Sequence, residues 1–433
     1  MAGEWPEVPL GELVQNFDRR RVPLSSRERE KRRGRFPYYG ATGVMDHVDD
    51  FLFQGLHLLV AEDGSVETTE GKPFLQLVGG QFWVNNHAHV LKGATDDDTT
   101  FLYYALSTVA IRPYISGSVQ AKLSQGNLNR IPIRYPAATE DRRAIARVLR
   151  TLDDKIELNR RMNETLEAMA RAIFKSWFVD FGPVRVKSEG RDPNLPPHLD
   201  HLFPDSFEDS ELGPIPRGWH VTSLRQLFPD DAECVLTGPF GTNLHAHDYR
   251  PEGVPLILVK HVVEGQILQN DLPLVGEHKL LELDRYRLRV GDIVFTRVGA
   301  VGRSALVHER NAGWLISGQL LRVRLGDWNV VHPRYLAQVY LEEAFIKMVE
   351  SHALGTTRPS LNTQLLREFR FVAPPSSLMR RYSERVATLD ARALRSRIES
   401  AHLAAIRDAL VPKLLSGGIR VRGAVGPSDA PLP

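Results

Sequence analysis

The chain has 433 residues, 42% of them hydrophobic and 25% charged, and its 55 Lys and Arg against 53 Asp and Glu leave a net charge of +2. This composition excludes collagen-like and intrinsically disordered proteins, and the length suggests two or three domains that each bury a core. The single cysteine, Cys234, excludes a disulfide-stapled scaffold, and a nearly neutral total does not by itself indicate a nucleic-acid-binding protein.

The N-terminus predicts a cytoplasmic protein with no membrane partner. Residues 1–6 lack the basic head and apolar run of a signal peptide. No apolar stretch in the chain approaches the ~20 residues that cross a bilayer.

Basic residues crowd the region that follows. Charge and aromatic rings alternate there, and the candidate DNA contacts are Arg19, Arg20, Arg21, Arg33, Arg35, Tyr38 and Tyr39. Dense Arg beside aromatic residues suits phosphate contact and close approach to a groove. A loop kept soluble by its charge explains the same residues equally well.

Two His-x-His pairs could begin a metal site, because alternate residues of a strand share a face. The pairs are His87/His89, after Asn86, and His245/His247. A closed or catalytic metal site needs further ligands, and the sequence offers no convincing set. We therefore expect polar residues on solvent-facing or DNA-facing strands, with Asn86 and His87 among the DNA contacts and no metal ligand.

The chain repeats itself once. Residues 117–124 match residues 355–362, and Thr151-Leu152-Asp153 matches Thr388-Leu389-Asp390 at nearly the same offset. Both matched loops are rich in side chains that hydrogen-bond base edges and phosphates. The candidates are Ser118, Gln120 and Lys122 in the first loop, and Thr356, Thr357, Arg358 and Asn362 in the second. Helix capping explains Ser124 or Asn362 equally well.

The second half carries a sparser basic set, with glycines that allow close backbone approach to a ligand. The candidate DNA contacts there are Gly241, Thr242, Asn243, Lys260, Arg297 and Arg303.

Each half ends in a long helix. A seam of apolar residues spaced by four and three runs from Ile145 to Trp177 and recurs from Tyr382 to Leu414. This pattern predicts a coiled coil, and the first helix would be a rod of about 48 Å. Polar residues interrupt both seams: Asn159 and Asn163 in the first, Ser396, Ser400 and Arg407 in the second, where Ile406 could rotate inward instead. The alternative is two ordinary amphipathic helices, each packed on its own domain.

We predict an α+β protein with a pseudo-two-fold internal repeat: two related mixed α/β domains separated by two long helices that pair as an antiparallel coiled coil. The expected boundaries are domain 1 at 1–136, a spacer helix at 137–185, a linker at 186–211, domain 2 at 212–375, a second spacer helix at 376–418 and a flexible tail at 419–433.

Several catalytic signatures are missing. The sequence has no phosphate-binding loop, no dinucleotide-binding glycine fingerprint and no Asn/Asp-Pro-Pro-aromatic tetrapeptide of an amino-methyltransferase. We expect no catalytic residue and no cofactor in this chain.

Over nearly its whole length the chain resembles the specificity subunit of type I restriction-modification systems. The residues that carry the resemblance are Tyr38–Gly43, Glu62-Asp63-Gly64 and Asn85–Val90 in the first half, Leu152–Asn159 in the helix, and Gly238–Thr242, Gly291–Val294 and Arg297-Val298-Gly299 in the second half. The order of these motifs, together with both helices, is specific, whereas any one motif alone is weak.

The resemblance implies a non-catalytic DNA-recognition subunit. Two target-recognition domains would each read one half of a bipartite site in double-stranded DNA, and the paired helices would set the gap. The resemblance also implies two modification (methylase) subunits that bring S-adenosylmethionine, and restriction (motor-nuclease) subunits that use ATP and Mg²⁺.

Apolar residues at the helix ends suggest a subunit interface. An exposed patch there could dock a partner helix, and its candidates are Phe174, Trp177, Phe178, Phe181, Leu414 and Leu415. Packing against the neighbouring domain is the alternative, because large apolar side chains are usually core.

Three rival functions remain at this point. The chain could serve a methylation-only assembly or a combined nuclease-methylase. It could also be a coiled-coil scaffold with two protein-binding heads, or a metal-dependent hydrolase.

Overall fold

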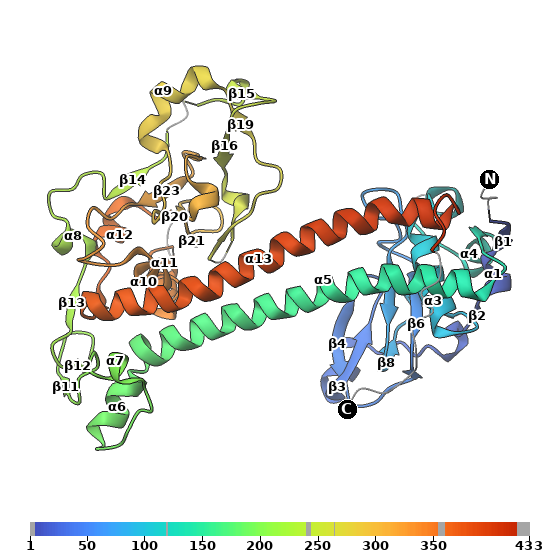
Figure 1. Cartoon of the computed structure of the whole chain (residues 1–433), viewed down its shortest axis with the longest axis horizontal. Helices are drawn as coiled ribbons and strands as arrows, with labels where there is room; N and C mark the ends of the chain where they lie inside the picture. Colours follow the sequence, from blue (N-terminus) through green and yellow to red (C-terminus); the bar gives the residue numbers. More distant parts are fainter. Residues whose placement is uncertain (1–4, 118–119, 240–243, 264, 354–359, 422–433) are drawn as a thin grey trace. The chain divides into compact units, whose positions relative to one another are not determined.

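The structure is a computed structural model of the chain, and it describes residues 5–117, 120–239, 244–263, 265–353 and 360–421. The chain forms two compact units, of which unit 1 comprises residues 1–163 and 395–433 and unit 2 comprises residues 164–394. Two long helices contribute to both units: α5 (Thr139–Phe174) and α13 (Ser376–Leu415) (Figure 1). Within the described residues, no helix is both long and apolar enough to cross a membrane.

Unit 1 contains two four-stranded sheets and one two-stranded sheet. The first sheet has the order β2-β9-β6-β7 and is antiparallel throughout; the second has the order β4-β3-β8-β5, in which β3 and β8 are parallel. The elements are β1 (Glu7–Pro9), α1 (Leu10–Leu13), β2 (Gln15–Asn16), η1 (Asp18–Arg20), α2 (Ser26–Lys31), β3 (Arg33–Tyr39), β4 (Val44–Val48), β5 (Phe53–Gln54), β6 (His57–Ala61), β7 (Leu75–Val78), β8 (Gln81–Val84), β9 (Ala88–Lys92), α3 (Asp96–Ser107), η2 (Arg112–Tyr114), α4 (Gln125–Asn129) and β10 (Pro132–Arg134).

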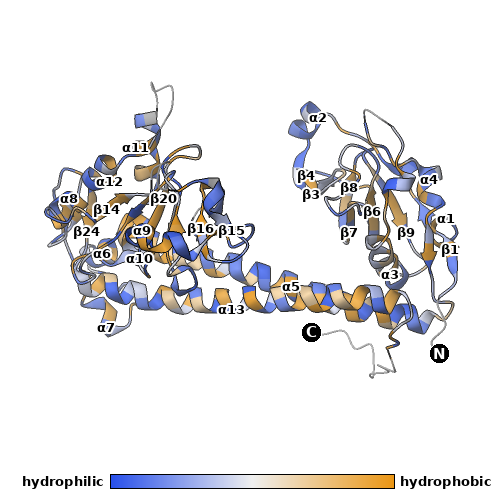
Figure 2. Cartoon of the chain, turned by 90° about the horizontal axis from the view of Figure 1, so that it is seen from above, coloured by the Kyte–Doolittle hydropathy of each residue, from blue (hydrophilic) through white to orange (hydrophobic). Residues whose placement is uncertain are grey.

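Strands β6 and β9 form the centre of unit 1. Every residue of β6 is buried, and its side chains pack against α3 on one face and the second sheet on the other. The two strands are strongly apolar, whereas α2 is hydrophilic (Figure 2). A strand that is buried on both faces loses the alternation of polar and apolar residues, which is why β6 is a continuous apolar run.

Unit 2 repeats this plan. Its sheets have the orders β14-β23-β20-β21 and β15-β19-β16-β22, with β16 and β22 parallel. The elements are η3 (Lys175–Val179), α6 (Gly182–Ser188), α7 (Pro197–Asp200), β11 (Phe207–Glu208), β12 (Ile215–Pro216), β13 (His220–Thr222), α8 (Leu224–Leu227), β14 (Val235–Thr237), η4 (Ala246–Asp248), β15 (Tyr249–Arg250), β16 (Val254–Ile257), η5 (Val259–His261), β17 (Val262–Val263), β18 (Gln266–Ile267), β19 (Leu274–Val275), η6 (Glu277–Lys279), α9 (Leu280–Leu283), η7 (Asp284–Tyr286), β20 (Ile293–Thr296), β21 (Ser304–Leu306), η8 (Glu309–Asn311), β22 (Leu315–Ile316), β23 (Leu320–Val323), α10 (Pro333–Val339), α11 (Glu343–Ala353), α12 (Thr363–Glu368) and β24 (Phe371–Ala373).

The predicted pairing of the two long helices is confirmed. In unit 1, Asn159 of α5 donates from Nδ2 to the Ser396 carbonyl and to Glu399 of α13, at 3.4 and 2.8 Å. In unit 2, the rings of Phe174 and Tyr382 meet at 5.7 Å between centroids. Since higher numbers on α5 meet lower numbers on α13, the helices are antiparallel.

Arg407 occupies the seam itself, and the expected inward rotation of Ile406 is wrong. Ile406 is 50% exposed. Arg407 NH1 donates to Asp153 Oδ1 at 2.6 Å, and Tyr104 of α3 donates to the other oxygen of Asp153 at 2.5 Å. A basic residue is tolerated in this seam because an acid from the partner helix neutralises it.

The segment expected as a linker, residues 186–211, is not an open connection. It contains part of α6, all of α7 and strand β11, which pairs with β12. Leu199 and Phe203 are buried in the core of unit 2. The sequence suggested a linker because proline, glycine and acidic residues dominate this segment. The few apolar residues that pack into the core follow no helical or strand period.

Candidate nucleic-acid interface

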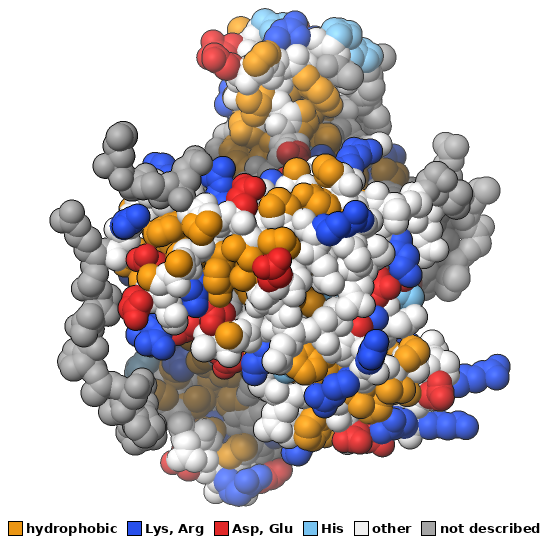
Figure 3. Space-filling view, turned by 90° about the vertical axis from the view of Figure 1, so that its right-hand side faces the viewer, with side chains coloured by type: hydrophobic (Ala, Val, Ile, Leu, Met, Phe, Trp, Pro, Cys, Tyr) orange, Lys and Arg blue, Asp and Glu red, His pale blue; other side chains and the backbone are white. Residues whose placement is uncertain are grey.

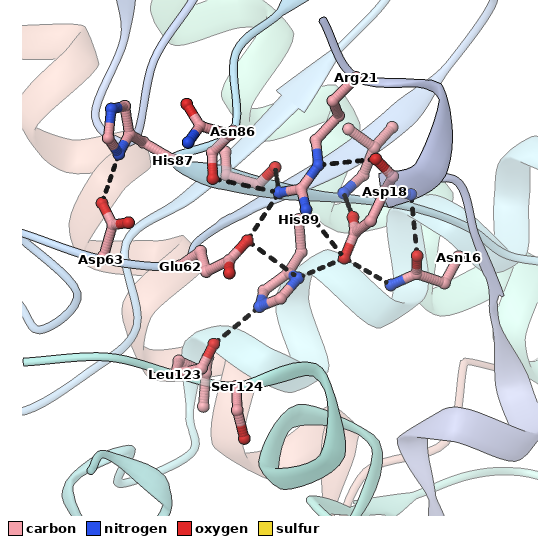
Figure 4. A network of polar contacts seen from close by, with 12 residues as sticks. Asn16, Asp18, Arg21, Glu62, Asp63, Asn86, His87, His89, Leu123 and Ser124 are labelled. Atoms are coloured by element: carbon pink, nitrogen blue, oxygen red, sulfur yellow. Dashed lines mark hydrogen bonds and ion pairs between the residues drawn. The ribbon is translucent and has the colours of Figure 1, made fainter. Parts of the chain in front are cut away.

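A buried histidine lies at the centre of the polar network in unit 1 (Figure 4). His89, on β9, is 1% exposed. Its Nδ1 lies 2.6 Å from Asp18 Oδ2, and its Nε2 lies 2.8 Å from the carbonyl oxygen of Leu123. The network therefore joins η1, the central sheet and the segment that precedes α4.

Arg21 extends this network to the strand ends. Its NH1 donates to Glu62 Oε2 at 2.7 Å and to the Ala88 carbonyl at 2.7 Å, and it lies 3.4 Å from the Asn86 carbonyl. The guanidinium also lies 3.6 Å from Asp18. One of the predicted DNA-contacting arginines thus holds the domain together.

Both central carboxylates are stabilised in their ionised form. Burial raises the pKa of Asp18, but hydrogen bonds from His89 and from the Val90 amide lower it more, so that the pKa lies below its ordinary value. Burial likewise raises the pKa of Glu62, but hydrogen bonds from Arg21 and Lys122 and the charge of His89 prevail, so that this pKa is lowered as well. Both groups are negatively charged at neutral pH.

The first of the two repeat-matched loops, which ends at residue 124 and is predicted to contact DNA, is bonded to this network. The Leu123 amide donates to the Glu62 carbonyl at 2.8 Å, and Lys122 Nζ lies 3.3 Å from Glu62 Oε1. Ser116 and Lys122 exchange two backbone hydrogen bonds of 2.8 Å. Gln120 and Lys122 are exposed at the surface.

Unit 2 attaches the matching segment in the same way. The Leu361 amide donates to the Arg297 carbonyl at 2.9 Å, just as Leu123 donates to Glu62. The next residue caps a helix in both units: Ser124 accepts from the Asn127 amide, and Asn362 accepts from the Leu365 amide at 2.8 Å. The capping explanation is therefore confirmed, and the Oδ1 atom of Asn362 is occupied by its own helix.

The predicted contacts of unit 1 differ in accessibility. Exposed side chains are those of Arg19, Arg20, Arg33, Arg35, Asn86, His87, Gln120 and Lys122, whereas Arg21 and Tyr39 are partly buried. The prediction for Tyr38 is wrong in this structure. Tyr38 is 1% exposed, and its hydroxyl accepts from the Leu24 amide at 2.9 Å. A Tyr ring at an inward-facing strand position contributes more by burial than by surface contact.

The exposed candidates of unit 1 form two groups. Asn86 and His87 follow β8 and lie near Lys122 around Glu62 and Asp63, with His87 Nδ1 2.6 Å from Asp63 Oδ1. Arg33 and Arg35 begin β3, whose far end, Tyr38–Tyr39, pairs in parallel with Trp83–Val84 of β8. The two arginines therefore lie at the opposite end of these strands from Asn86.

In unit 2, three basic candidates come from neighbouring segments. Arg297 and Arg303 flank the turn between β20 and β21, where the Thr296 amide donates to the Arg303 carbonyl at 2.9 Å. The Cβ position of Gly299 in that turn is 3.8 Å from Val259, the residue before Lys260. Lys260 and Arg303 are exposed, and Arg297 is partly buried. The remaining candidates, Ser118, Gly241, Thr242, Asn243, Thr356, Thr357 and Arg358, lie outside the described residues.

The expected subunit-interface patch is buried within the chain. Exposed fractions are 2% for Phe174, 6% for Trp177, 5% for Phe178, 9% for Phe181, 2% for Leu414 and 6% for Leu415. The four aromatic residues pack in the core of unit 2 and the two leucines in the core of unit 1. The prediction of an exposed docking patch is wrong, because the adjoining domain cores already cover these large apolar side chains.

A metal ion competes poorly for the central network. The ligand atoms of Asp18, Glu62 and His89 lie within 4.8 Å of one another. However, Arg21 and Lys122 already neutralise the carboxylates. A divalent cation would displace a guanidinium from a partly buried site, so we assign the network to hydrogen bonds and ion pairs.

Charged and apolar side chains are mixed over the surface shown in Figure 3, where Lys and Arg alternate with Asp and Glu. The near balance of positive and negative charge in the whole sequence, a net charge of +2, is thus also found on this face. Cys234 is fully buried, and burial raises the pKa of its thiol to about 11, so it serves as a small core residue.

Sequence reasoning missed Asp18 and Glu62 as the partners of His89. Asp18 precedes His89 by 71 residues, and no local spacing connects them. Glu62 directly follows a buried apolar strand. An acidic residue at the end of such a strand was the only feature of the sequence that could have pointed to a polar network there.

Comparisons with known proteins agree with this architecture. Residues 2–168 match the family described as "Type I restriction modification DNA specificity domain". The chain is 26% identical over 330 residues to the type I restriction enzyme MjaIX specificity subunit of Methanocaldococcus jannaschii, covering 74% of this chain and 69% of that protein. It is 25% identical over 323 residues to the HindI specificity subunit of Haemophilus influenzae, covering 65% and 67%.

A solved structure shares the fold. The crystal structure of a type I restriction-modification S subunit from M. genitalium superposes with a TM-score of 0.61 at 17% identity, covering 95% of this chain and 96% of that one. This chain and that S subunit therefore share a fold. Residues 2–168 thus match the type I restriction modification DNA specificity domain, and the chain is similar over most of its length to specificity subunits of type I restriction enzymes.

Proposed function

We propose that each unit of this chain reads one half of a bipartite site in double-stranded DNA. One observation carries the proposal: the segments that end at Leu123 and Leu361, which we call the reading segments, are hydrogen-bonded to equivalent strand ends of the two units. Each segment lies beside exposed basic residues, Lys122 in unit 1 and Arg303 in unit 2. Two similar readers on one chain suit a target with two separate halves.

In this proposal, α5 and α13 set the gap between the half-sites and dock two modification subunits. Because the aromatic residues at the end of α5 are buried, docking would use the outer faces of the two helices. Exposed apolar side chains on these faces are Leu158, Met169 and Ile398, at 54%, 48% and 48%. Apolar side chains on an exposed helix face suit a partner helix.

The chemistry belongs to the partners in this assembly. Modification subunits supply S-adenosylmethionine and methylate adenine, restriction subunits use ATP and Mg²⁺, and this chain acts without catalysis. The absence of nucleotide-binding and methyltransferase signatures from the sequence supports this division.

The test is to map methylated adenines in cells that carry the complete system. We expect a bipartite motif, and replacing residues 1–136 by those of a relative should change only one half of it. A continuous motif, or a change in both halves, would contradict the assignment of one unit to each half-site.

A further inference from the structure

Two contacts fix the ring of His89 from opposite sides. A carbonyl oxygen only accepts, so Nε2, which lies 2.8 Å from the Leu123 carbonyl, is the donor of that hydrogen bond. Nδ1 faces Asp18 Oδ2 at 2.6 Å and Glu62 Oε2 at 3.8 Å. The ring therefore connects Asp18 of η1 to the backbone of the segment that precedes α4.

Ion pairs around His89 hold the same segment. Arg21 lies 2.7 Å and Lys122 3.3 Å from the Glu62 carboxylate, and the exposed His87 lies 2.6 Å from Asp63. Loss of the His89 ring would leave the Leu123 carbonyl without its donor. That change weakens the hold on residues 120–123.

We infer that His89 is a positioning residue for DNA recognition by unit 1. The inference rests on the proposed function. Nε2 of His89 fixes the Leu123 carbonyl, and the adjoining exposed residues Gln120 and Lys122 are held where they can contact DNA.

Unit 2 contains a natural control for this inference. Leu321 pairs with Phe295 in the central sheet as His89 pairs with Val60 in unit 1. Leu321 is fully buried and has no polar side-chain atom. Replacing His89 should therefore weaken discrimination of the first half-site and leave the second unchanged.

His57 gives a matched control within unit 1. It is 5% exposed and lies on β6, beside β9, but its Nδ1 contacts only the Gly55 carbonyl, at 3.2 Å, among the described contacts. Burial and the charges of Lys92 and Arg20 lower the pKa of His57, so its ring is neutral. Replacing His57 tests the loss of a buried ring without the loss of the contact to residue 123.

Two variants at position 89 separate positioning from packing. His89→Gln places an amide nitrogen near the position of Nε2 and keeps the donor to Leu123, whereas His89→Asn places it near Nδ1 and loses that donor. Binding of the full chain is measured on duplexes with either half-site scrambled. We expect His89→Asn to reduce discrimination of the first half-site roughly ten- to hundredfold, as the loss of a donor to a buried carbonyl implies. His89→Gln should lose less, and His57→Gln nothing.

A DNA-free measurement keeps the inference separable from the proposed function. Amide exchange of peptides covering 120–124 should quicken in His89→Asn but not in His57→Gln. If this holds but no bipartite site is bound, the proposed function fails while the positioning role of His89 stands.

Other outcomes would overturn the inference. These are equal effects of His89→Asn and His57→Gln, or loss of discrimination at both half-sites. Stoichiometric metal that disappears in His89→Asn would also overturn it, since the network would then be a metal site.

Discussion

Asp153 links three elements of unit 1 through its two oxygens. Its carboxylate accepts from Arg407 of α13 and Tyr104 of α3 while it lies on α5. Burial lowers the pKa of Arg407, but hydrogen bonds to Asp153 and Asp408 raise it more, so the guanidinium stays charged. The repeat-matched Asp390 is likewise bonded to Arg334 of α10 in unit 2. Each aspartate ties a long helix to its own globular domain.

Replacing Asp153 should therefore destabilise unit 1. Asp153→Asn turns one acceptor into a donor that faces Arg407 or Tyr104, and we expect the free energy of unfolding to fall by about 1–3 kcal/mol. Asp154→Asn is the matched control, because Asp154 is 70% exposed and lies 3.6 Å from Arg150. Urea unfolding measures both, and similar losses for the two variants would contradict the linking role.

His332 gives unit 2 a defined sensitivity to acid. Burial, followed by the charges of Arg334 and Arg380, lowers its pKa from 6.5 to about 4. Its Nδ1 accepts from the Arg334 amide at the start of α10 and lies 2.8 Å from the Ser383 hydroxyl. The folded state therefore keeps the ring neutral, while the unfolded state takes up a proton at higher pH.

Because the folded pKa of His332 is depressed, stability is lost as the pH falls from about 6.5 to about 4. His332→Asn keeps an acceptor suited to a helix start and removes the titration. We expect the melting temperature of the variant to depend less on pH in that window. Identical pH profiles would show that His332 does not contribute to the acid sensitivity.

At the scale of elements, substitutions of Asn362 at the start of α12 can separate a helix-capping role from a DNA-contacting role. Asn362→Ala removes the acceptor for the Leu365 amide and should cost about 1 kcal/mol. Asn362→Asp keeps the acceptor and places a negative charge at a helix start, so thermal stability should be retained. If the Asn362 amide also contacts DNA, Asn362→Asp should weaken binding without loss of stability, whereas unchanged binding would restrict Asn362 to capping.

The long helices were predictable because their signal is local. Seam residues such as Ile145, Leu149 and Leu166 recur every three or four positions, and the structure buries each of them. The sheets were not predictable in this way, since strands of two to seven residues pair with partners far along the chain, as Val8 does with Ile133. Short strands buried on both faces carry no alternation from which their order could be inferred.

For the candidate site, the sequence indicated which kinds of side chain could contact DNA better than it indicated which of them are exposed. The basic and polar candidates mostly lie at the surface, but Tyr38 and Trp177 are buried because a sequence does not reveal which face a neighbouring element covers. The network around His89 joins segments that are distant in the chain. The sequence repeat matches residues 123 and 361, and the structure shows that both amides bond to equivalent strand ends, since matched residues in matched folds make matched contacts.

At the scale of the whole molecule, the proposed role of the helices as a spacer makes a quantitative prediction. Seven residues added to both α5 and α13 extend each helix by about 10 Å, because an α-helix rises 1.5 Å per residue. Placing the insertions at 163/164 and 394/395, where the two compact units divide the helices, leaves the contacts within each unit unchanged. Since DNA rises about 3.4 Å per base pair, the unspecified gap should grow by about three base pairs while both half-sites stay the same.

Methylation mapping of the lengthened chain measures this directly. A heptad inserted at 163/164 of α5 alone is the control. The pairing of Asn159 with Glu399 and the pairing of Phe174 with Tyr382 can then no longer be kept together, so the variant should lose methylation rather than shift the gap. An unchanged gap after the double insertion would mean that contacts outside the helices fix the spacing of the half-sites. A changed half-site sequence would mean that the helices contribute to reading as well as to spacing.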